Sequence, residues 1–355
     1  MRNGWTASLR GVARKLAPLA LACAFGLGLF QNAHAAAITP GIIEAAKKEG
    51  RVAFYTPLIV DQIVRPLTAA FRAKYGIPVE FLRMDSGAVV LKVLNEYRAR
   101  RPVADAFTTS LGIEALISAG AIRQFHVAGA DVLPPGYKDP NNFWVADRVY
   151  VLEPVVNTKL VPVADRPKTY EDLLHPKWAG KLVWRDANLT GATGFVGGML
   201  MGMGEEKGMD FLRKLARQKV VVLRVSDRAV LDQVIAGEYP LALAMTNHNV
   251  EISRKEGAPV AWIPMQPAIV FSEQMGLTKL GTHPNAALLF VDFALSREGQ
   301  QVFQKAGYIP ARPDVPPLDP TLLPAAGGFT ASVATPDIVA KNRKHWDDVY
   351  RELFR

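Results

Sequence analysis

Several short groups of hydroxyl, amide and charged side chains follow directly after apolar runs of this 355-residue sequence. In LALAMTNHNV (241–250), five apolar residues are followed by Thr246, Asn247 and His248. A buried strand that turns polar at its end either enters an ordinary loop or points its polar tip into a cleft. Because such side chains can hold a ligand through hydrogen bonds, these groups are the candidates for a binding site.

Two of these groups have the composition of an anion-binding loop. In DSGAVV (85–90) and NLTGATGF (188–195), a hydroxyl and a glycine run into the predicted start of a helix. Free backbone N–H groups and the helix dipole favour an anion at such a place. The alternative is ordinary N-capping of the two helices by Ser86 and Thr193.

Two charged residues near these loops also have two interpretations. Arg185 could bind a phosphonate or carboxylate through paired hydrogen bonds, or could form a surface ion pair with Asp186. Asp227 could hold an amine of the ligand or cap the next helix, and we favour capping. In all, we expect these residues to contact the ligand: Tyr55, Thr56, Ser86, Gly87, Thr109, Ser110, Arg185, Thr190, Gly191, Ala192, Thr193, Ser226, Asp227, Thr246, Asn247 and His248.

The sequence carries no pattern for catalysis or for a metal centre. A hydrolase would need Ser110 or Ser226 as nucleophile and His248 as base, but there is no G-x-S-x-G elbow and no Walker loop. The five histidines after residue 35 are far apart and lack metal-ligand spacing. We therefore predict that the protein is not an enzyme and has no catalytic residue, metal ligand or cofactor.

Alternating strand and helix patterns place the polar groups at one edge of a sheet. Apolar, β-rich runs alternate with helical spacings such as Ile63, Leu67 and Phe71, which predicts βαβαβ units with a parallel sheet. In open α/β sheets, ligands bind beyond the carboxyl ends of the strands. The predicted strands are 51–55, 79–83 and 104–110 in the first half and 181–185, 220–225 and 241–245 in the second.

Extended segments between the two halves indicate two domains joined by a hinge. Residues 143–160 form two extended runs with no helix between them, and further extended runs after 260 would carry the chain back. Two crossings of this kind, near 148–157 and 262–270, make a hinge. We predict an α/β protein with residues 36–147 and 268–355 in domain I, residues 148–267 in domain II, and the ligand cleft between the domains. The proline-rich segment 310–324 is predicted to be a surface loop ahead of a last helix.

The first 35 residues have the pattern of a secretory signal peptide. Basic residues precede an apolar run at 16–30, and Ala33 and Ala35 have the small size needed near a cleavage point. A membrane anchor is the alternative, but the run is shorter than the ~20 apolar residues that span a bilayer. The single cysteine, Cys23, lies in this segment, so the mature chain forms no disulfide. These features predict a protein free in the periplasm.

The charge of the mature chain disfavours nucleic acid as a partner. The signal segment holds four of the 42 basic residues, which leaves 38 against 33 acidic residues, a net charge of +5. Lys and Arg are scattered among Asp and Glu and form no basic stripe. At most, this mild excess favours an anionic ligand.

The mature chain resembles the periplasmic substrate-binding proteins of ATP-driven importers, in the branch that includes the ferric-ion-binding proteins. The resemblance is carried in order by FYTPLIVDQIVRPLTAAFRAKYGIPVEF, VLNEYRARRPVADAF, TYEDLLHPKWAGKLVWRD, IAGEYPLALAM and HPNAALLFVDFALSREGQQVF. It implies a type II, Venus-flytrap fold with two hinge-crossing strands. It also implies a small-molecule ligand between the domains and an inner-membrane ABC permease as partner, and we expect a monomer.

Within this resemblance, the positions of the family's iron ligands carry other residues. Iron-binding members have a Tyr-Tyr pair where this chain has Asn247 and His248, and their His and Glu ligands align with Ile59 and Ser110. Phenolates suit Fe(III) because they are hard anionic donors, and Asn is neutral. The loop that holds a synergistic anion in iron-binding members aligns with 190–193 here.

The ligand implied by these differences is a small organic anion or zwitterion of the phosphonate, phosphate ester or carboxylate type. The alternative is a ferric-ion-binding protein with a non-standard ligand set that uses tyrosines such as Tyr55, Tyr137 or Tyr150.

Overall fold

The computed structural model describes residues 38–186 and 189–355. The predicted signal peptide and Cys23 lie outside the described residues, as does Asn188 of the second loop. The described chain falls within one compact unit. Within it, no helix is long and apolar enough to cross a membrane.

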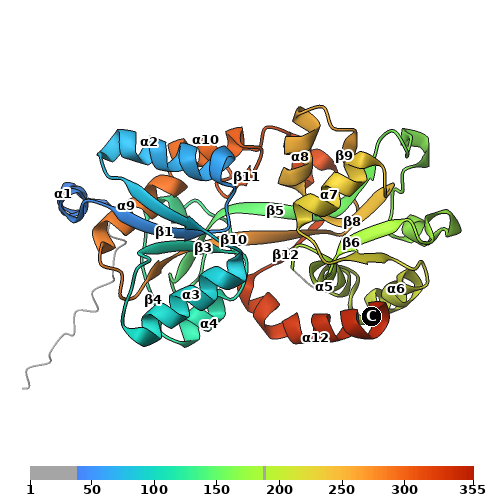
Figure 1. The fold of residues 1–355 in the computed structure, drawn as a ribbon, viewed down its shortest axis with the longest axis horizontal. Coiled ribbons are helices and arrows are strands. Elements are labelled where there is room, and N and C mark those ends of the chain that lie inside the picture. The colour runs from blue at the N-terminus through green and yellow to red at the C-terminus, as the bar shows by residue number, and fades with distance from the viewer. Residues whose placement is uncertain (1–37, 187–188) are drawn as a thin grey trace, which may run out of the picture. The chain divides into compact units, whose positions relative to one another are not determined.

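The first lobe contains the parallel strands predicted from the first half of the sequence (Figure 1). Strand β1 pairs with β2 on one side and with β3 on the other, all in parallel. Helices α2 and α3 form the crossovers, and α9 and α10 return to this lobe from late in the chain. The elements are α1 (Pro40–Glu49), β1 (Val52–Thr56), α2 (Arg65–Tyr75), β2 (Val79–Arg83), α3 (Ser86–Ala99), β3 (Ala106–Thr109), α4 (Ile113–Ser118), α9 (Pro284–Leu295) and α10 (Arg297–Lys305).

Two long antiparallel strands connect this lobe to the second. Strand β10 (Ala268–Thr278) pairs with β3 and with β5 (Trp144–Asn157), and β5 also pairs with β8. The path of the sheet therefore runs β2-β1-β3-β10-β5-β8-β6-β7. The segment predicted as two extended runs is one continuous strand, β5. Short strands pair along the two long ones: β4 (Ile122–Arg123), β9 (Val260–Trp262), β11 (Ile309–Pro310) and β12 (Ala331–Ala334).

The second lobe repeats the parallel arrangement. Strand β6 pairs in parallel with β7 and β8, as the second half of the sequence predicted. Immediately after β8, the chain enters a helix rather than a polar loop, so Asn247 and His248 lie in the first turn of α8. The elements are β6 (Leu182–Arg185), α5 (Ala192–Met203), α6 (Glu205–Ala216), β7 (Val221–Leu223), α7 (Asp227–Ala236), β8 (Leu241–Thr246) and α8 (Asn247–Lys255).

The last helix, α12 (Pro336–Phe354), packs against both lobes. It contacts α4 of the first lobe and α5 and α6 of the second (Figure 1). Trp184 of β6 lies edge-on to Tyr350 and Phe354, with ring centroids 6.0 and 4.7 Å away. The predicted domain I includes this helix, although the helix packs largely against the second lobe. The boundaries of the two domains stay a prediction.

The segment ahead of α12 contains more secondary structure than its prolines indicate. A surface loop was predicted for 310–324, yet the chain pairs with β5 at β11 and turns through short helices at Pro320–Leu322 and Pro324–Gly327. It then adds β12 in parallel to β10. Prolines at the first positions of the two short helices explain why they are compatible with structure there.

Candidate functional site

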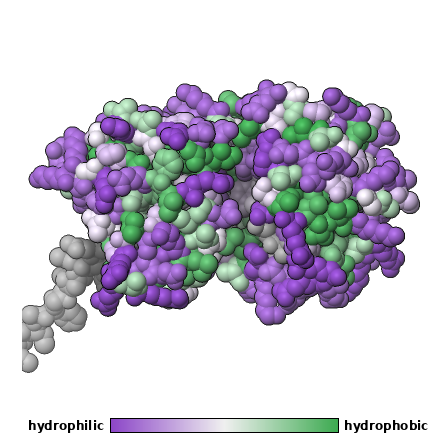
Figure 2. All heavy atoms as spheres, in the orientation of Figure 1, coloured by the Kyte–Doolittle hydropathy of each residue, from purple (hydrophilic) through white to green (hydrophobic). Residues whose placement is uncertain are grey.

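A cleft of about 830 Å³ lies at the carboxyl ends of the strands of both lobes. Loops after β1, β2 and β3 line it from the first lobe, and loops after β6 and β7 together with the start of α8 line it from the second. Figure 2 shows the hollow near the middle of the molecular face. This is the edge at which open α/β sheets bind ligands.

The cleft is rich in charge. Five arginines and four carboxylates line it, together with His248 and several hydroxyl groups. Five guanidinium groups on one cleft suit an anionic ligand, because guanidinium groups bind carboxylates and phosphates through paired hydrogen bonds. The charged residues are Arg83, Arg148, Arg185, Arg224, Arg228, Asp85, Asp186, Asp227 and Glu273.

A buried ionic group forms the floor of the cleft on the two long strands. Arg148 of β5 is 5% exposed and pairs with Asp147 through Nη1 at 3.1 Å and with Glu273 through Nη2 at 3.2 Å. Adjacent strand residues normally point to opposite faces, but the register between β5 and β10 shifts between Glu273 and Gln274. This bulge gives Asp147 no partner of its own on β10 and lets its carboxylate reach the neighbouring guanidinium.

The two carboxylates of this group hold protons more tightly than usual. Burial raises the pKa of Asp147 to about 6 and that of Glu273 to about 7, although the charge of Arg148 opposes both shifts. Oε1 of Glu273 and Nε of Arg148 have no hydrogen-bond partner among the described residues. Near neutral pH, Arg148 therefore faces carboxylates that are close to titrating.

The ring of Tyr308 lies against the guanidinium of Arg148. Cζ of Arg148 lies 5.3 Å from the ring centroid of Tyr308, and the imidazole of His248 stacks on the same tyrosine with centroids 4.5 Å apart. Burial, with a smaller effect of Arg148, lowers the pKa of His248 to about 3, so the ring is neutral. A neutral imidazole can still donate one hydrogen bond to an anion.

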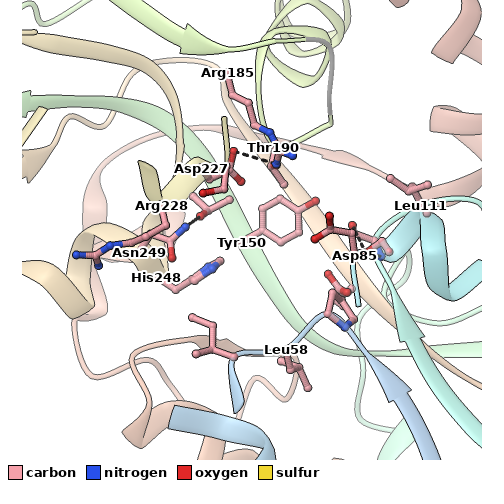
Figure 3. A pocket seen from close by; sticks show the side chains of 18 of the residues that line it. Leu58, Asp85, Leu111, Tyr150, Arg185, Thr190, Asp227, Arg228, His248 and Asn249 are labelled. Carbon is pink, nitrogen blue, oxygen red and sulfur yellow. Dashed lines mark hydrogen bonds and ion pairs between the residues drawn. The ribbon is translucent and has the colours of Figure 1, made fainter. Parts of the chain in front are cut away.

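Tyr150 lies in the middle of the cleft between the two lobes' polar groups. In Figure 3 its ring stands between Asp227 on one side and Asp85 on the other. Burial raises its pKa above the ordinary value of 10, so the hydroxyl stays protonated. A protonated phenol at this place is available as a hydrogen-bond donor to a ligand.

Arg185 and Asp227 form a partly buried ion pair on the second-lobe side. Nη1 of Arg185 lies 3.4 Å from Oδ1 of Asp227 (Figure 3), and burial raises the pKa of that carboxyl group, opposed by hydrogen bonding from Thr190. The expected partner of Arg185, Asp186, instead accepts a hydrogen bond of 2.7 Å from Tyr350. Capping of α7 by Asp227 was the preferred interpretation and is wrong: the cap is Ser226, whose Oγ accepts from the backbone N–H of Ala229 at 3.2 Å.

On the first-lobe side, Ser86 and Ser110 bind each other. Their Oγ atoms lie 3.0 Å apart, and the backbone N–H of Ser110 donates to Oγ of Ser86 at 3.1 Å. Ser86 is the first residue of α3, whose N-cap is Asp85, so N-capping by Ser86 does not occur. The two hydroxyls together face the cleft beside the start of α3.

The structure brings some of the predicted site residues together and buries others. Those that line the cleft are Ser86, Gly87, Ser110, Arg185, Thr190, Ser226, Asp227, Thr246 and His248. Those that do not line it are Tyr55, Thr56, Thr109, Gly191, Ala192, Thr193 and Asn247.

The buried residues from the first lobe have partners inside the fold. The hydroxyl of Tyr55 donates to Glu96 at 2.7 Å. Thr56 shares a 2.8 Å hydrogen bond with Thr108, and Thr109 donates to the carbonyl of Leu111 at 2.6 Å. These hydrogen bonds hold the strand ends in place. None of the three side chains lines the cleft.

The same holds for the loop ahead of α5 and for the start of α8. A Cβ on Gly191 would lie 2.8 Å from the carbonyl oxygen of Arg185, so this glycine permits a close approach of backbone rather than of a ligand. Ala192 is fully buried. Asn247 accepts a hydrogen bond from the backbone N–H of Val151 at 3.0 Å, which ties α8 to β5.

Replacement of Thr193 by alanine is expected to lower stability and to leave ligand affinity unchanged. Thr193 is fully buried and donates to Oδ1 of Asp347 in α12 at 2.7 Å, so it neither caps α5 nor faces the cleft. Loss of this bond should cost about 1–3 kcal/mol of unfolding free energy, because a partly buried carboxylate oxygen loses its donor. Urea unfolding measures the loss. An unchanged unfolding midpoint with weaker ligand binding would contradict this placement.

Among the cleft residues that were not predicted, three were missed because they lie within long apolar strands or before a short one. Arg148 belongs to β5, Glu273 belongs to β10, and Tyr308 precedes β11. Tyr150 of β5 was considered only as a possible iron ligand. The sequence did contain a signal for two of them. Arg148 and Glu273 are charged residues within apolar runs that are otherwise typical of fully buried strands. Charges are rarely buried unless they are paired or bind a ligand.

Known proteins resemble the chain over most of its length. Iron uptake protein A1 of Synechocystis is 22% identical over 258 residues, 68% of this chain and 70% of that protein. The crystal structure of iron-bound HitA from Pseudomonas aeruginosa has a TM-score of 0.72 at 22% identity, covering 84% of this chain and 99% of that chain. AfuA from Actinobacillus pleuropneumoniae, with fructose-6-phosphate bound, has a TM-score of 0.67 at 20% identity, covering 86% and 98%.

The family itself is shown by a match over residues 102–327 to the bacterial extracellular solute-binding proteins. The chain belongs to this family, and its fold is that of the two-domain periplasmic binding proteins. It is thus a substrate-binding component of an ABC importer, as its resemblance to the ferric-ion-binding branch predicted. Proteins of this family bind small ligands and work with ABC permeases.

Proposed function

We propose that the cleft captures a small organic anion of the phosphonate, phosphate ester or carboxylate type and delivers it to an inner-membrane permease. The observation that carries this proposal is the convergence of arginines from both lobes on one cleft, with Arg185 and Arg148 partly and fully buried there. A desolvated guanidinium binds an oxyanion more strongly than an exposed one, since water no longer screens the pair. The four carboxylates of the cleft could pair with an amino group on the same ligand.

Ferric ion remains the second candidate, because Tyr150 and Tyr308 both line the cleft. Against it, no group of three or more His, Cys, Asp or Glu side chains that could hold a metal occurs among residues 38–186 and 189–355. Burial also raises the pKa of both tyrosines, that of Tyr308 to about 12, which disfavours the phenolate that Fe(III) requires. Of the other tyrosines considered, neither Tyr55 nor Tyr137 lines the cleft.

The similar structures are compatible with either ligand. HitA was crystallised with iron and AfuA with a sugar phosphate, and both share this fold. At about 20% identity these structures show a shared fold only, and the arginines that line the cleft of this chain support the organic anion.

The proposed function requires the two lobes to close on the ligand. β5 and β10 are the strands shared by both lobes, and we expect them to bend as the hinge. A ligand found by thermal-shift screening of phosphate esters, phosphonates and carboxylates should lower the radius of gyration measured by small-angle scattering. The variant Arg185→Ala at the same ligand concentration should keep the larger radius of gyration of the open form. It lacks one guanidinium of the cleft and therefore binds the ligand more weakly. A radius of gyration that is unchanged in the saturated wild-type protein would contradict closure.

A further inference from the structure

The carboxylate of Glu273 stands where an anionic ligand would have to bind. Both Arg148 and Glu273 line the cleft, and Oε2 of Glu273 lies 3.2 Å from Nη2 of Arg148. Asp147, which is fully buried and does not line the cleft, holds Nη1 at 3.1 Å. In this structure, the guanidinium at the cleft floor is therefore already paired on the face that a ligand would use.

This arrangement has an excess of negative charge. One guanidinium serves two carboxylates, and Oε1 of Glu273 is buried without a hydrogen-bond partner among the described residues. Burial of an unpaired carboxylate oxygen is costly, and within the described part of the chain Arg148 is the ionic partner that stabilises the ionised form of Glu273. Whatever takes Arg148 away from Glu273 removes the main reason for it to stay ionised.

We propose that Glu273 is an internal competitor for Arg148, which an anionic ligand displaces, and that the displaced carboxylate takes up a proton from solvent. This inference rests on the proposed function and adds to it a residue that sets ligand specificity and pH dependence. The step conserves charge simply: the ligand's oxyanion replaces one carboxylate at the guanidinium, and one proton neutralises the carboxylate that is left behind.

Of the titratable groups around Glu273, none competes with it as the acceptor of that proton. Arg148 and Asp147 face it from β5, Tyr150 from the same strand, and Tyr308 from the chain before β11. Both tyrosines are protonated throughout the neutral range, because burial raises their pKa, and His248 is neutral with a pKa of about 3. Asp147 keeps its bond to Arg148 and has no access to the cleft.

The direction of the pH effect follows from the same contacts. The pKa of Glu273 is about 7 beside Arg148, so at pH 8 a ligand must displace a charged carboxylate, whereas at pH 5.5 the carboxyl group is already neutral. Anion binding should therefore weaken as the pH rises through 7. A ligand that carries two negative charges should show the effect more than one that carries a single charge.

Sulfate is the probe that tests this, because it does not titrate between pH 5.5 and 8. Calorimetry in two buffers of different ionisation enthalpy should show wild-type protein taking up about half to one proton per sulfate at pH 7.5. Glu273→Gln keeps the shape and removes the charge, so it should bind sulfate about tenfold more tightly than wild type at pH 8, about equally at pH 5.5, and without proton uptake.

Asp85→Asn is the matched control. Asp85 is another carboxylate that lines the cleft, but it makes no ion pair with Arg148. Its removal should strengthen sulfate binding at both pH values by general electrostatics, and proton uptake should persist.

Three results would overturn the inference. Wild-type protein that binds sulfate without proton uptake would show that Glu273 is not displaced. Weaker sulfate binding by Glu273→Gln would show that the carboxylate supports the anion instead of competing with it. Absence of sulfate, phosphate and carboxylate binding by all three proteins would contradict the proposed function itself and this inference with it.

Discussion

Arg148→Met is expected to destabilise the protein by about 3–5 kcal/mol at pH 8 and by clearly less at pH 5. Methionine fills a similar volume but leaves Asp147 and Glu273 buried without the guanidinium that pairs with both. Removal of one partner from a buried ionic group costs more than the group contributed, since the remaining charges are neither hydrated nor paired.

The pH dependence has a definite sign. Asp147 and Glu273 have folded-state pKa values of about 6 and 7, above their ordinary values of 3.8 and 4.5. The folded state therefore binds more protons than the unfolded state between those values, and stability falls as the pH rises through them. Without Arg148 both pKa values should rise further, so the added loss is greatest above pH 7 and small at pH 5.

Urea unfolding at pH 5 and pH 8 measures this difference. Arg213→Met, at an exposed position of α6 away from the cleft, is the matched control and should change neither value by more than about 0.5 kcal/mol. An equal loss at the two pH values for Arg148→Met would contradict the ionic group described here.

The fold could be predicted from the sequence because its elements have strong local patterns. The alternation of β-rich runs and helical spacings gave β1, β2, β3, β6, β7 and β8 to within two residues. The prediction of β5 was wrong in one respect. This single strand was predicted as two runs, because Asp147, Arg148 and Glu153 interrupt its apolar pattern. In the structure all three side chains are buried, and Arg148 pairs with Asp147 on its own strand and with Glu273 across the sheet.

The candidate site could be predicted only in part, for a physical reason. Residues after strand ends do lie at the correct edge of the sheet, but which of them turn toward solvent depends on packing that no spacing reveals. Thr193 faces α12, a helix more than 140 residues later, and Asn247 faces the backbone of β5. Conversely, Tyr308 reaches the cleft only because β11 pairs with β5. Contacts of this range carry no local signal.

The second large effect concerns the chemical nature of the ligand. If arginines rather than phenolates hold it, ferric citrate should cause no visible charge-transfer band and no rise in melting temperature, whereas the cognate organic anion should stabilise the protein by about 3–4 kcal/mol at concentrations of several hundred Kd. The reason is that Tyr150 and Tyr308 stay protonated, and the positions that align with the family's iron ligands hold Ile59, Ser110, Asn247 and His248.

One measurement on a single purified sample tests this central claim most directly. The protein is denatured, the released small molecules are analysed by mass spectrometry, and the metal content of the same sample is determined. We predict an organic anion at up to one molecule per chain and iron far below that ratio. Iron at one atom per chain, with a visible band that is lost in Tyr150→Phe or Tyr308→Phe and no organic anion released, would contradict the account.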